Sequence, residues 1–316
     1  MADNYQKIIT AIKTAKTPAV ICHMRPDGDT LGSALALKAV MPNISVYCES
    51  VISSYYDILP DIKTVISAEI VPMAHDLLIA VDCGDSHRLG KNKKAFLKHR
   101  NTINIDHHGT NESFAALNFV RPKVSSTGEL VFNLIKDMGF ALNKDAAECL
   151  YIAVCTDTGN FTQSNTSPES YLMAAELIKF NIDVSYLNRK LYSEMPYNKV
   201  KLLAKVLDGL KLYTYGKISL TDLSLKTLNE YGCKSCDTEG FVEYAINTEG
   251  VLIGILLTEI ARNSYKASLR SRPGVDVSRP AAYFNGGGHK QASGCIISGK
   301  IEDVIDKLVF ECSKEI

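Results

Sequence analysis

Four times in its first half, this chain ends an apolar segment on acidic and histidine residues. The four clusters are His-Met-Arg-Pro-Asp-Gly-Asp at 23–29, Val-Asp-Cys-Gly-Asp at 81–85, Asp-His-His-Gly at 106–109 and Thr-Asp-Thr-Gly at 156–159. The first three follow segments short enough to be buried strands, and the fourth follows an apolar segment with the length of a helix. In open α/β sheets, ligands collect beyond the carboxyl ends of the strands. We therefore expect a fold that gathers these clusters at one edge of a sheet.

Short apolar segments alternate with segments of helical spacing over residues 1–185. The segments typical of buried strands are 19–22, 44–48, 77–81 and 102–105. Those typical of helices are 5–16, 31–40, 145–154 and 168–180. This alternation predicts an α/β domain with a mostly parallel sheet and helices on both of its faces.

A different pattern follows in the last third of the chain. Residues 186–210 are rich in Leu, Lys and Tyr at helical spacing, which predicts a helical linker with a break at Pro196. The strand patterns beyond it lie at 212–220, 251–258 and 265–272. We therefore expect a first domain over residues 1–185, this linker, and a smaller α+β domain over residues 211–316.

Composition argues against several classes of protein. The 316 residues contain 35 Lys and Arg against 35 Asp and Glu, so we expect no binding of long duplex DNA through the overall charge. No apolar run approaches the roughly 20 residues that span a bilayer, and the N-terminus lacks the apolar core of a secretory signal. These features predict a cytoplasmic protein whose nine cysteines stay reduced. Cys233 and Cys236 are typical of a loop before a helix, since a zinc ribbon would need a second pair or histidines nearby.

The first cluster alone favours a turn, because its Pro-Asp-Gly-Asp sequence suits one and Asp29 could cap the following helix. The four clusters together favour a metal site instead. Carboxylates about 4 Å apart repel by roughly 4 kcal/mol per pair at a surface-like dielectric, so converging aspartates need protons or cations. Two divalent ions would balance four carboxylates. The candidate ligands are His23, Asp27, Asp29, Asp82, His107 and Asp157.

The chemistry of these donors restricts the choice of metal. Oxygen and nitrogen donors without thiolate point to manganese first, with magnesium, cobalt and zinc as alternatives. Cys22 and Cys83 each adjoin a candidate ligand. Because neighbours on extended backbone point to opposite faces, both thiols are expected to face the core.

The motifs in this order resemble those of the DHH phosphoesterases, and Gly-Gly-Gly-His at 286–289 resembles the signature of their DHH-associated domain. The resemblance covers nearly the whole chain. It is greatest to the NrnA-type oligoribonucleases, which also act as phosphatases on 3′-phosphoadenosine 5′-phosphate. It implies one metal held by His23 and Asp27, a second held by Asp29, His107 and Asp157, and Asp82 as a bridge between the two.

The resemblance also implies roles beside the metals. His108 would face the substrate phosphate, where it would stabilise the phosphate oxygens or protonate the leaving oxygen, and Asp106 would orient the imidazoles. A role for His108 as a third metal-binding histidine stays open, because adjacent histidines can both coordinate. One departure from the family is Asn285, which stands where a fourth glycine is common; asparagine tolerates positive φ better than most residues.

The second domain is expected to select the substrate. The resemblance places substrate contacts at Arg262, Gly286, Gly287, Gly288 and His289. Backbone N–H groups of a glycine run can form an anion cradle, and arginine can bind phosphate through two hydrogen bonds. We add Ser268 and Arg270, on the neighbouring predicted strand, as further candidates. The alternative to a substrate site is that the glycine run forms a tight turn and the arginines are solvated surface residues.

These features predict a two-metal hydrolase of phosphate esters in short oligoribonucleotides and 3′-phosphoadenosine 5′-phosphate. Its expected partners are short single-stranded RNA or small nucleotides, and a homodimer stays open. A phosphodiesterase of cyclic di-AMP or its linear product pApA is an alternative that no residue separates from this reading. A family II inorganic pyrophosphatase would carry a different second-domain signature, and a non-catalytic nucleotide-binding protein would be expected to lack at least one ligand.

Overall fold

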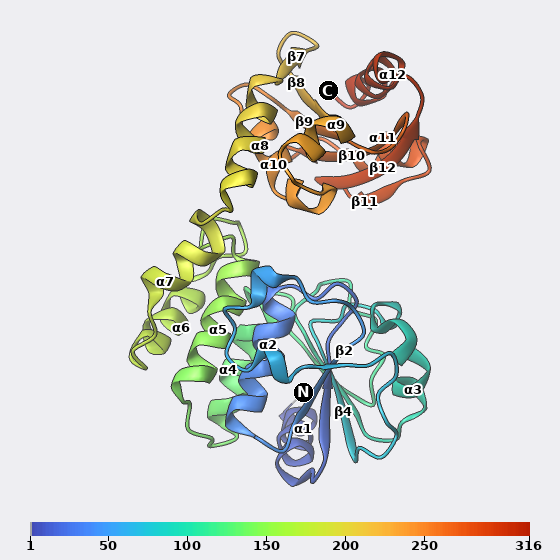
Figure 1. Ribbon diagram of the computed structural model, residues 1–316. Helices are drawn as coiled ribbons and strands as arrows, with labels where there is room; N and C mark the ends of the chain where they lie inside the picture. Colours follow the sequence, from blue (N-terminus) through green and yellow to red (C-terminus); the bar gives the residue numbers. More distant parts are fainter. Residues whose placement is uncertain (1) are drawn as a thin grey trace. The chain divides into compact units, whose positions relative to one another are not determined.

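The computed structural model describes residues 2–316. The chain divides into two compact units, Met1–Glu194 and Met195–Ile316, and each is described by itself (Figure 1). None of the helices within the described residues is both long and apolar enough to cross a membrane.

The first unit is built on a six-stranded sheet. Its strands are β1 (Pro18–Ile21), β2 (Ser45–Cys48), β3 (Ile66–Ser67), β4 (Leu77–Val81), β5 (Thr102–Asp106) and β6 (Leu117–Val120). All neighbours pair in parallel, in the order β3-β2-β1-β4-β5-β6, so the direction of winding reverses between β1 and β4. Ligands bind such sheets at this switch point, outside the carboxyl ends of the strands.

Helices cover both faces of this sheet, which confirms the expected α/β architecture (Figure 1). They are α1 (Ala2–Thr14), α2 (Gly28–Val40), α3 (Lys93–Lys98), α4 (Thr127–Asp137), α5 (Lys144–Asp157), α6 (Pro168–Ile178) and α7 (Val184–Asn188). Short 3-10 helices lie at Ser54–Tyr56 (η1), Ile62–Thr64 (η2) and Ser86–Asn92 (η3), and a π-helix lies at Arg189–Ser193 (η4). β1 contributes to both cores, because Val20 packs with residues of α1, α2, α4 and α5, whereas Ala19 and Ile21 pack with Phe96 of α3.

Helices α2, α4 and α5 approach one another very closely. A Cβ on Gly32 of α2 would lie 2.4 Å from the carbonyl oxygen of Cys149 in α5. A Cβ on Gly128 of α4 would lie 2.6 Å from the Cβ of Ala153 in α5. Because only glycine leaves room for such contacts, these two residues let the beginnings of α2 and α4 lie beside the last turns of α5.

The second unit is built on a mixed sheet. Its strands are β7 (Lys211–Tyr213), β8 (Ile218–Leu223), β9 (Ile253–Ala261), β10 (Ser264–Ser271), β11 (Gly287–His289) and β12 (Ala292–Ser298), in the order β11-β12-β10-β9-β8-β7. Its helices are α8 (Tyr197–Asp208), α9 (Leu225–Glu230), the 3-10 helix η5 (Ser235–Thr238), α10 (Phe241–Ile246), α11 (Ser278–Tyr283) and α12 (Ile301–Ser313). One hydrophobic core includes residues of α8, α9 and α10, and the other includes residues of α11 and α12, as expected for an α+β domain.

Two local predictions are wrong. The segment 212–220, predicted as one strand, forms the hairpin of β7 and β8, because Thr214 and Tyr215 adopt left-handed backbone (φ 49° and 55°) that reverses the chain. The run 286–289, for which an anion cradle or a tight turn was expected rather than a strand, contributes the edge strand β11, which pairs with β12. The close approach to β12 requires glycine, because a Cβ on Gly288 would lie 2.5 Å from the carbonyl oxygen of Ala292. The predicted helical stretch 186–210 is interrupted at Pro196, the residue that precedes α8.

Candidate metal centre

Carboxylates and imidazoles from several elements converge at the carboxyl end of the parallel sheet. His23 and Asp27 lie in the loop after β1, Asp82 directly follows β4, His107 follows β5, and Asp157 ends α5. Three groups have candidate ligand atoms within 4.8 Å of one another: His23 with Asp27 and Asp82, Asp29 with His107 and Asp157, and Asp82 with His107 and His108. The structure therefore brings together all six side chains that the sequence predicts as metal ligands.

Asp82 lies at the centre of these groups. Its Oδ2 is 3.5 Å from Nε2 of His23, and its Oδ1 is 3.7 Å from Nε2 of His107, so each oxygen faces a different group. The hydroxyls of Thr30 and Thr127 donate to Oδ2 at 2.8 Å and to Oδ1 at 3.1 Å. Asp82 also has a left-handed backbone (φ 58°), which for a residue other than glycine costs on the order of 1–3 kcal/mol. A strained, buried residue with this many partners is held in place by its surroundings.

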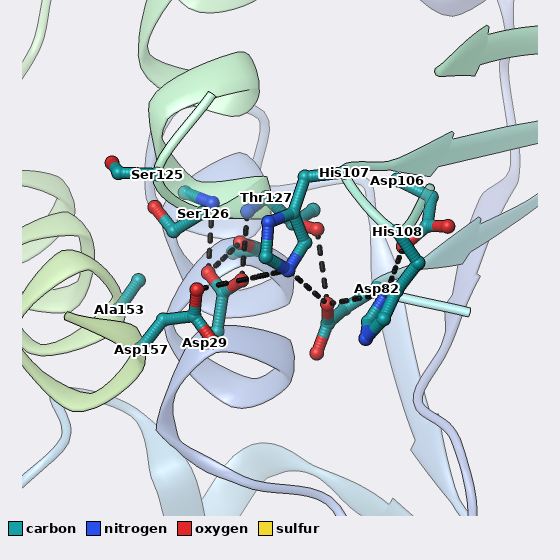
Figure 2. Close-up of polar contacts among 12 residues, drawn as sticks. Asp29, Asp82, Asp106, His107, His108, Ser125, Ser126, Thr127, Ala153 and Asp157 are labelled. Atoms are coloured by element: carbon teal, nitrogen blue, oxygen red, sulfur yellow. Dashed lines mark hydrogen bonds and ion pairs between the residues drawn. The ribbon is translucent and has the colours of Figure 1, made fainter. Parts of the chain in front are cut away.

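Asp29 belongs to the second group, together with His107 and Asp157 (Figure 2). Nε2 of His107 lies 4.0 Å from Oδ2 of Asp29 and 3.7 Å from Oδ2 of Asp157. The Asp29 carboxylate also accepts the backbone N–H groups of Thr127 and Gly128, at 2.7 and 2.8 Å. Asp29 therefore caps the N-terminus of α4, where the helix dipole favours a negative charge. The alternative considered from the sequence, in which Asp29 caps the helix that follows the first cluster, is wrong.

Asp27 is the residue that caps α2. Its Oδ1 accepts the backbone N–H of Thr30 at 3.0 Å, which leaves Oδ2 to face Nε2 of His23 at 3.9 Å. Nδ1 of His23 lies 2.8 Å from the carbonyl oxygen of Met24. Because a carbonyl oxygen can only accept, this nitrogen carries the proton and Nε2 presents its lone pair to the two carboxylates. The imidazole is thus oriented as a metal ligand should be.

His108 and Asp106 form a separate hydrogen-bonded pair beside the centre. Asp106 is fully buried, and its Oδ1 lies 2.7 Å from Nδ1 of His108. The side-chain amide of Asn111 donates to the other oxygen of Asp106. The hydrogen bond from His108 to Asp106 raises the pKa of the imidazole, although burial opposes this. His108 is therefore oriented by Asp106 and biased towards the protonated form.

The carboxylates of the centre differ in their tendency to ionise. Burial raises the pKa of Asp29 well above its usual range, and the charges of Asp82 and Asp157 raise it further. Burial also raises the pKa of Asp157, to about 6. Burial opposes ionisation of Asp82 as well, but the neighbouring His23, together with His108 and the hydroxyl of Thr30, holds its pKa below the usual value. The site as a whole has an excess of negative charge that favours cations.

Donor spacing and chemistry both fit divalent metal ions. The 3.5–4.0 Å separations between ligand atoms exceed hydrogen-bond length, but they suit donors that share an ion at about 2.1 Å each. Cys22 and Cys83 are buried among apolar residues, and burial raises the pKa of both thiols. The donors are thus nitrogen and oxygen, which suit manganese, magnesium, cobalt or zinc.

Several residues that contact the centre were not recognised from the sequence. They are Thr30, Thr127, Arg88 and Asn165, whose side-chain amide donates to Asp157 at 3.0 Å. The Ser-Ser-Thr-Gly stretch at 125–128 does indicate the start of α4, since Ser126 accepts the N–H of Glu129 as the helix cap. No local signal shows that the neighbouring Thr127 contacts Asp82, because that contact depends on the packing of α4 against the sheet. For Arg88, the only signal in the sequence is that it follows the second motif.

The predicted substrate residues occupy two places in the second unit. Ser268 of β10 pairs with Gly294 of β12, and Gly294 pairs in turn with Gly287 of β11, so Ser268 and the glycine run are in register. Arg270 lies on the same strand as Ser268 and donates to Glu243 at 2.8 Å. Arg262 is exposed in the turn before β10. Four residues of β10 separate this turn from Ser268, which is a distance of about 13 Å along the strand.

Comparison with known proteins gives matches over most of the chain. Residues 18–154 match the DHH family, N-terminal domain, and residues 223–314 match the DHHA1 domain. The bifunctional oligoribonuclease and PAP phosphatase NrnA of Thermus thermophilus is 29% identical over 98% of this chain and 93% of its own length. The Bacillus subtilis protein of the same name is 26% identical over 92% of each chain. A crystal structure of an exopolyphosphatase-related protein from Bacteroides fragilis superposes with a TM-score of 0.91 at 27% identity, over 99% of this chain and 96% of the other.

The raised pKa of Asp157 predicts how the stability of the metal-free protein depends on pH. A folded-state pKa of about 6, against roughly 3.9 when unfolded, means that the folded state binds more protons between these values. Stability in the presence of EDTA is therefore expected to fall as the pH rises from about 4 to 7. Asp157→Asn should reduce this slope, measured by urea denaturation at several pH values. The exposed Asp145, at the other end of α5, gives the control Asp145→Asn; equal slopes in both variants would contradict the prediction.

Proposed function

This chain belongs to the DHH family, and we propose that it is a two-metal hydrolase of phosphate esters in short oligoribonucleotides and in 3′-phosphoadenosine 5′-phosphate. The observation that carries the proposal is the convergence of six nitrogen and oxygen ligands beside the pair of His108 and Asp106. The names of relatives aligned over nearly the whole chain support this substrate class. A non-catalytic nucleotide-binding protein fits less well, because none of the six ligands is lost.

We assign one ion to His23 and Asp27, the other to Asp29, His107 and Asp157, and a bridging role to Asp82. The assignment follows the two oxygens of Asp82, each of which faces one imidazole. Manganese is proposed because the ligands are carboxylates and imidazoles without thiolate. When bound, two such ions supply an activated water and neutralise charge on the phosphate oxygens.

His108 is proposed as the group that meets the phosphate. Asp106 engages Nδ1, and 35% of the His108 side chain is exposed. An imidazolium in this position can stabilise an equatorial phosphate oxygen or give its proton to the leaving oxygen. The buried Asp106 carboxylate keeps the ring in one orientation and favours the charged form.

The glycine run and His289 are proposed to bind a phosphate of the substrate. A Cβ on Gly287 would meet nothing within 4 Å, so the fold itself does not require glycine there. We attribute the glycine at position 287 to the close approach of a ligand to the backbone. Ser268, in register with Gly287, is proposed as a neighbouring contact. Arg262 and Arg270 are proposed as further contacts, and Arg270 would have to leave Glu243 to reach a phosphate.

The function is tested by incubating the purified protein with Mn²⁺ and a set of separate substrates. These are labelled RNAs of two to five nucleotides, 3′-phosphoadenosine 5′-phosphate, cyclic di-AMP, pApA and pyrophosphate. We expect release of mononucleotides from the RNAs and of phosphate from 3′-phosphoadenosine 5′-phosphate, and loss of both activities in Asp82→Asn. Hydrolysis confined to the cyclic dinucleotide or pApA would favour that alternative, and hydrolysis of pyrophosphate alone, or of nothing, would refute the proposal.

Replacing His108 separates its catalytic role from metal binding. His108→Ala is expected to retain the metal content of the wild type, measured by elemental analysis, because the other ligands remain. Its kcat should fall by roughly 100- to 10,000-fold, as is usual when a proton donor is removed. Loss of a bound ion in this variant would show instead that His108 is a ligand.

Alanine substitutions in the glycine run separate binding from folding. Gly287→Ala should raise KM for 3′-phosphoadenosine 5′-phosphate without lowering the melting temperature, since the new methyl group meets only a ligand. Gly286→Ala is the matched comparison and should destabilise the protein, because its Cβ would lie 2.2 Å from the carbonyl oxygen of Gly294. An unchanged KM in Gly287→Ala would argue against a phosphate site at this strand.

A further inference from the structure

Arg88 is fixed to the loop that carries His23. It lies in η3, where the carboxylate of Asp85 accepts the backbone N–H groups of His87 and Arg88 at 2.8 and 3.2 Å. The carbonyl oxygen of Arg88 in turn accepts the N–H of Met24 at 2.8 Å. The backbone of this arginine is therefore anchored on both sides, directly beside the metal centre.

The guanidinium of Arg88 has an unusual partner. Its Nη2 lies 3.2 Å from Nε2 of His23 and 3.5 Å from Nδ1. Because Nδ1 has its proton committed to the Met24 carbonyl oxygen, the guanidinium donates to the lone pair of Nε2. Among the side chains of residues 4–316, no carboxylate oxygen lies within 4.0 Å of the Arg88 side-chain nitrogens, although several carboxylates surround the site. Arg88 is thus half-buried without an acidic partner.

The guanidinium thus contacts His23, which we assign to a metal. A residue that merely balanced the acidic groups would be expected to pair with one of them, and Arg88 does not.

The single lone pair of Nε2 cannot serve both Arg88 and a metal ion. An ion on His23 would take away the hydrogen-bond partner of the guanidinium while adding positive charge beside it. The carboxylates Asp27 and Asp82 would then be shared with the ion. The remaining anion able to approach is the substrate phosphate, whose oxygens arginine binds through two parallel hydrogen bonds.

We propose that Arg88 has two partners in succession: the imidazole of His23 in the metal-free protein, and a phosphate oxygen of the substrate in the metal-loaded one. The second part rests on the proposed phosphoesterase function. The first part concerns only the metal-free protein. Arg88 would thus compete with the metal for His23 and would become a substrate-binding residue once that competition is lost.

The test compares Arg88→Ala and Arg88→Lys with the wild type in two measurements. Titration calorimetry with Mn²⁺ and no substrate should show tighter binding to Arg88→Ala, by about threefold or more, because a competing positive charge is gone. KM for 3′-phosphoadenosine 5′-phosphate should rise roughly 10- to 100-fold, as expected on losing a charge-assisted contact, and inhibition by inorganic phosphate should weaken in parallel. Arg88→Lys keeps the charge without the fork and should lie between the two.

Arg100→Ala is the matched control, since Arg100 is exposed and precedes β5 at the end opposite Asp106. It should change neither measurement. Weaker Mn²⁺ binding in Arg88→Ala would overturn the proposal by making Arg88 a support of the metal site, and an unchanged KM would overturn the substrate contact. Arg88→Gln replaces the alanine variant if that variant does not fold. A wild type inactive on every phosphate ester would refute the proposed function, whereas tighter Mn²⁺ binding would still support the competition for His23.

Discussion

Asp29, Asp82 and Asp106 are almost fully buried within one small region, and keeping their charges there governs the structure around them. Each has its own hydrogen-bond partners. The N-terminus of α4 donates to Asp29, the hydroxyls of Thr30 and Thr127 donate to Asp82, and His108 pairs with Asp106. These contacts offset part of the desolvation of the carboxylates. Cations would offset the rest of the desolvation cost. This explains why the imidazoles face the carboxylates at distances longer than a hydrogen bond.

Much of this arrangement could be predicted from the sequence. Each of the first three motifs follows a short apolar segment, and the parallel order of the sheet places the ends of β1, β4 and β5 side by side. The rule that ligands bind at the switch point then locates the site. The alternation of short and helical segments was also sufficient to predict the α/β architecture.

What the sequence does not reveal are contacts that depend on tertiary packing. That Asp29 caps α4 rather than the helix following it follows from the approach of α2 and α4, which no local pattern encodes. The pairing of Arg270 with Glu243, and of Arg88 with His23, likewise joins residues far apart in the chain. Turn chemistry was misread at Thr214 and Tyr215, because neither residue is usual in left-handed backbone.

The tight junction at Gly32 and Gly128 has a consequence for metal selectivity. Asp29 lies in the first turn of α2 and Asp157 ends α5, so the gap between these two carboxylates is set by the separation of two rigid helices, not by a flexible loop. Helix separation in turn depends on Ala153, which faces both glycines. A larger residue at this hidden position would widen the gap by a fraction of an ångström. Substitutions in the protein interior can therefore change the preference among ions of different radius, while every metal ligand stays the same.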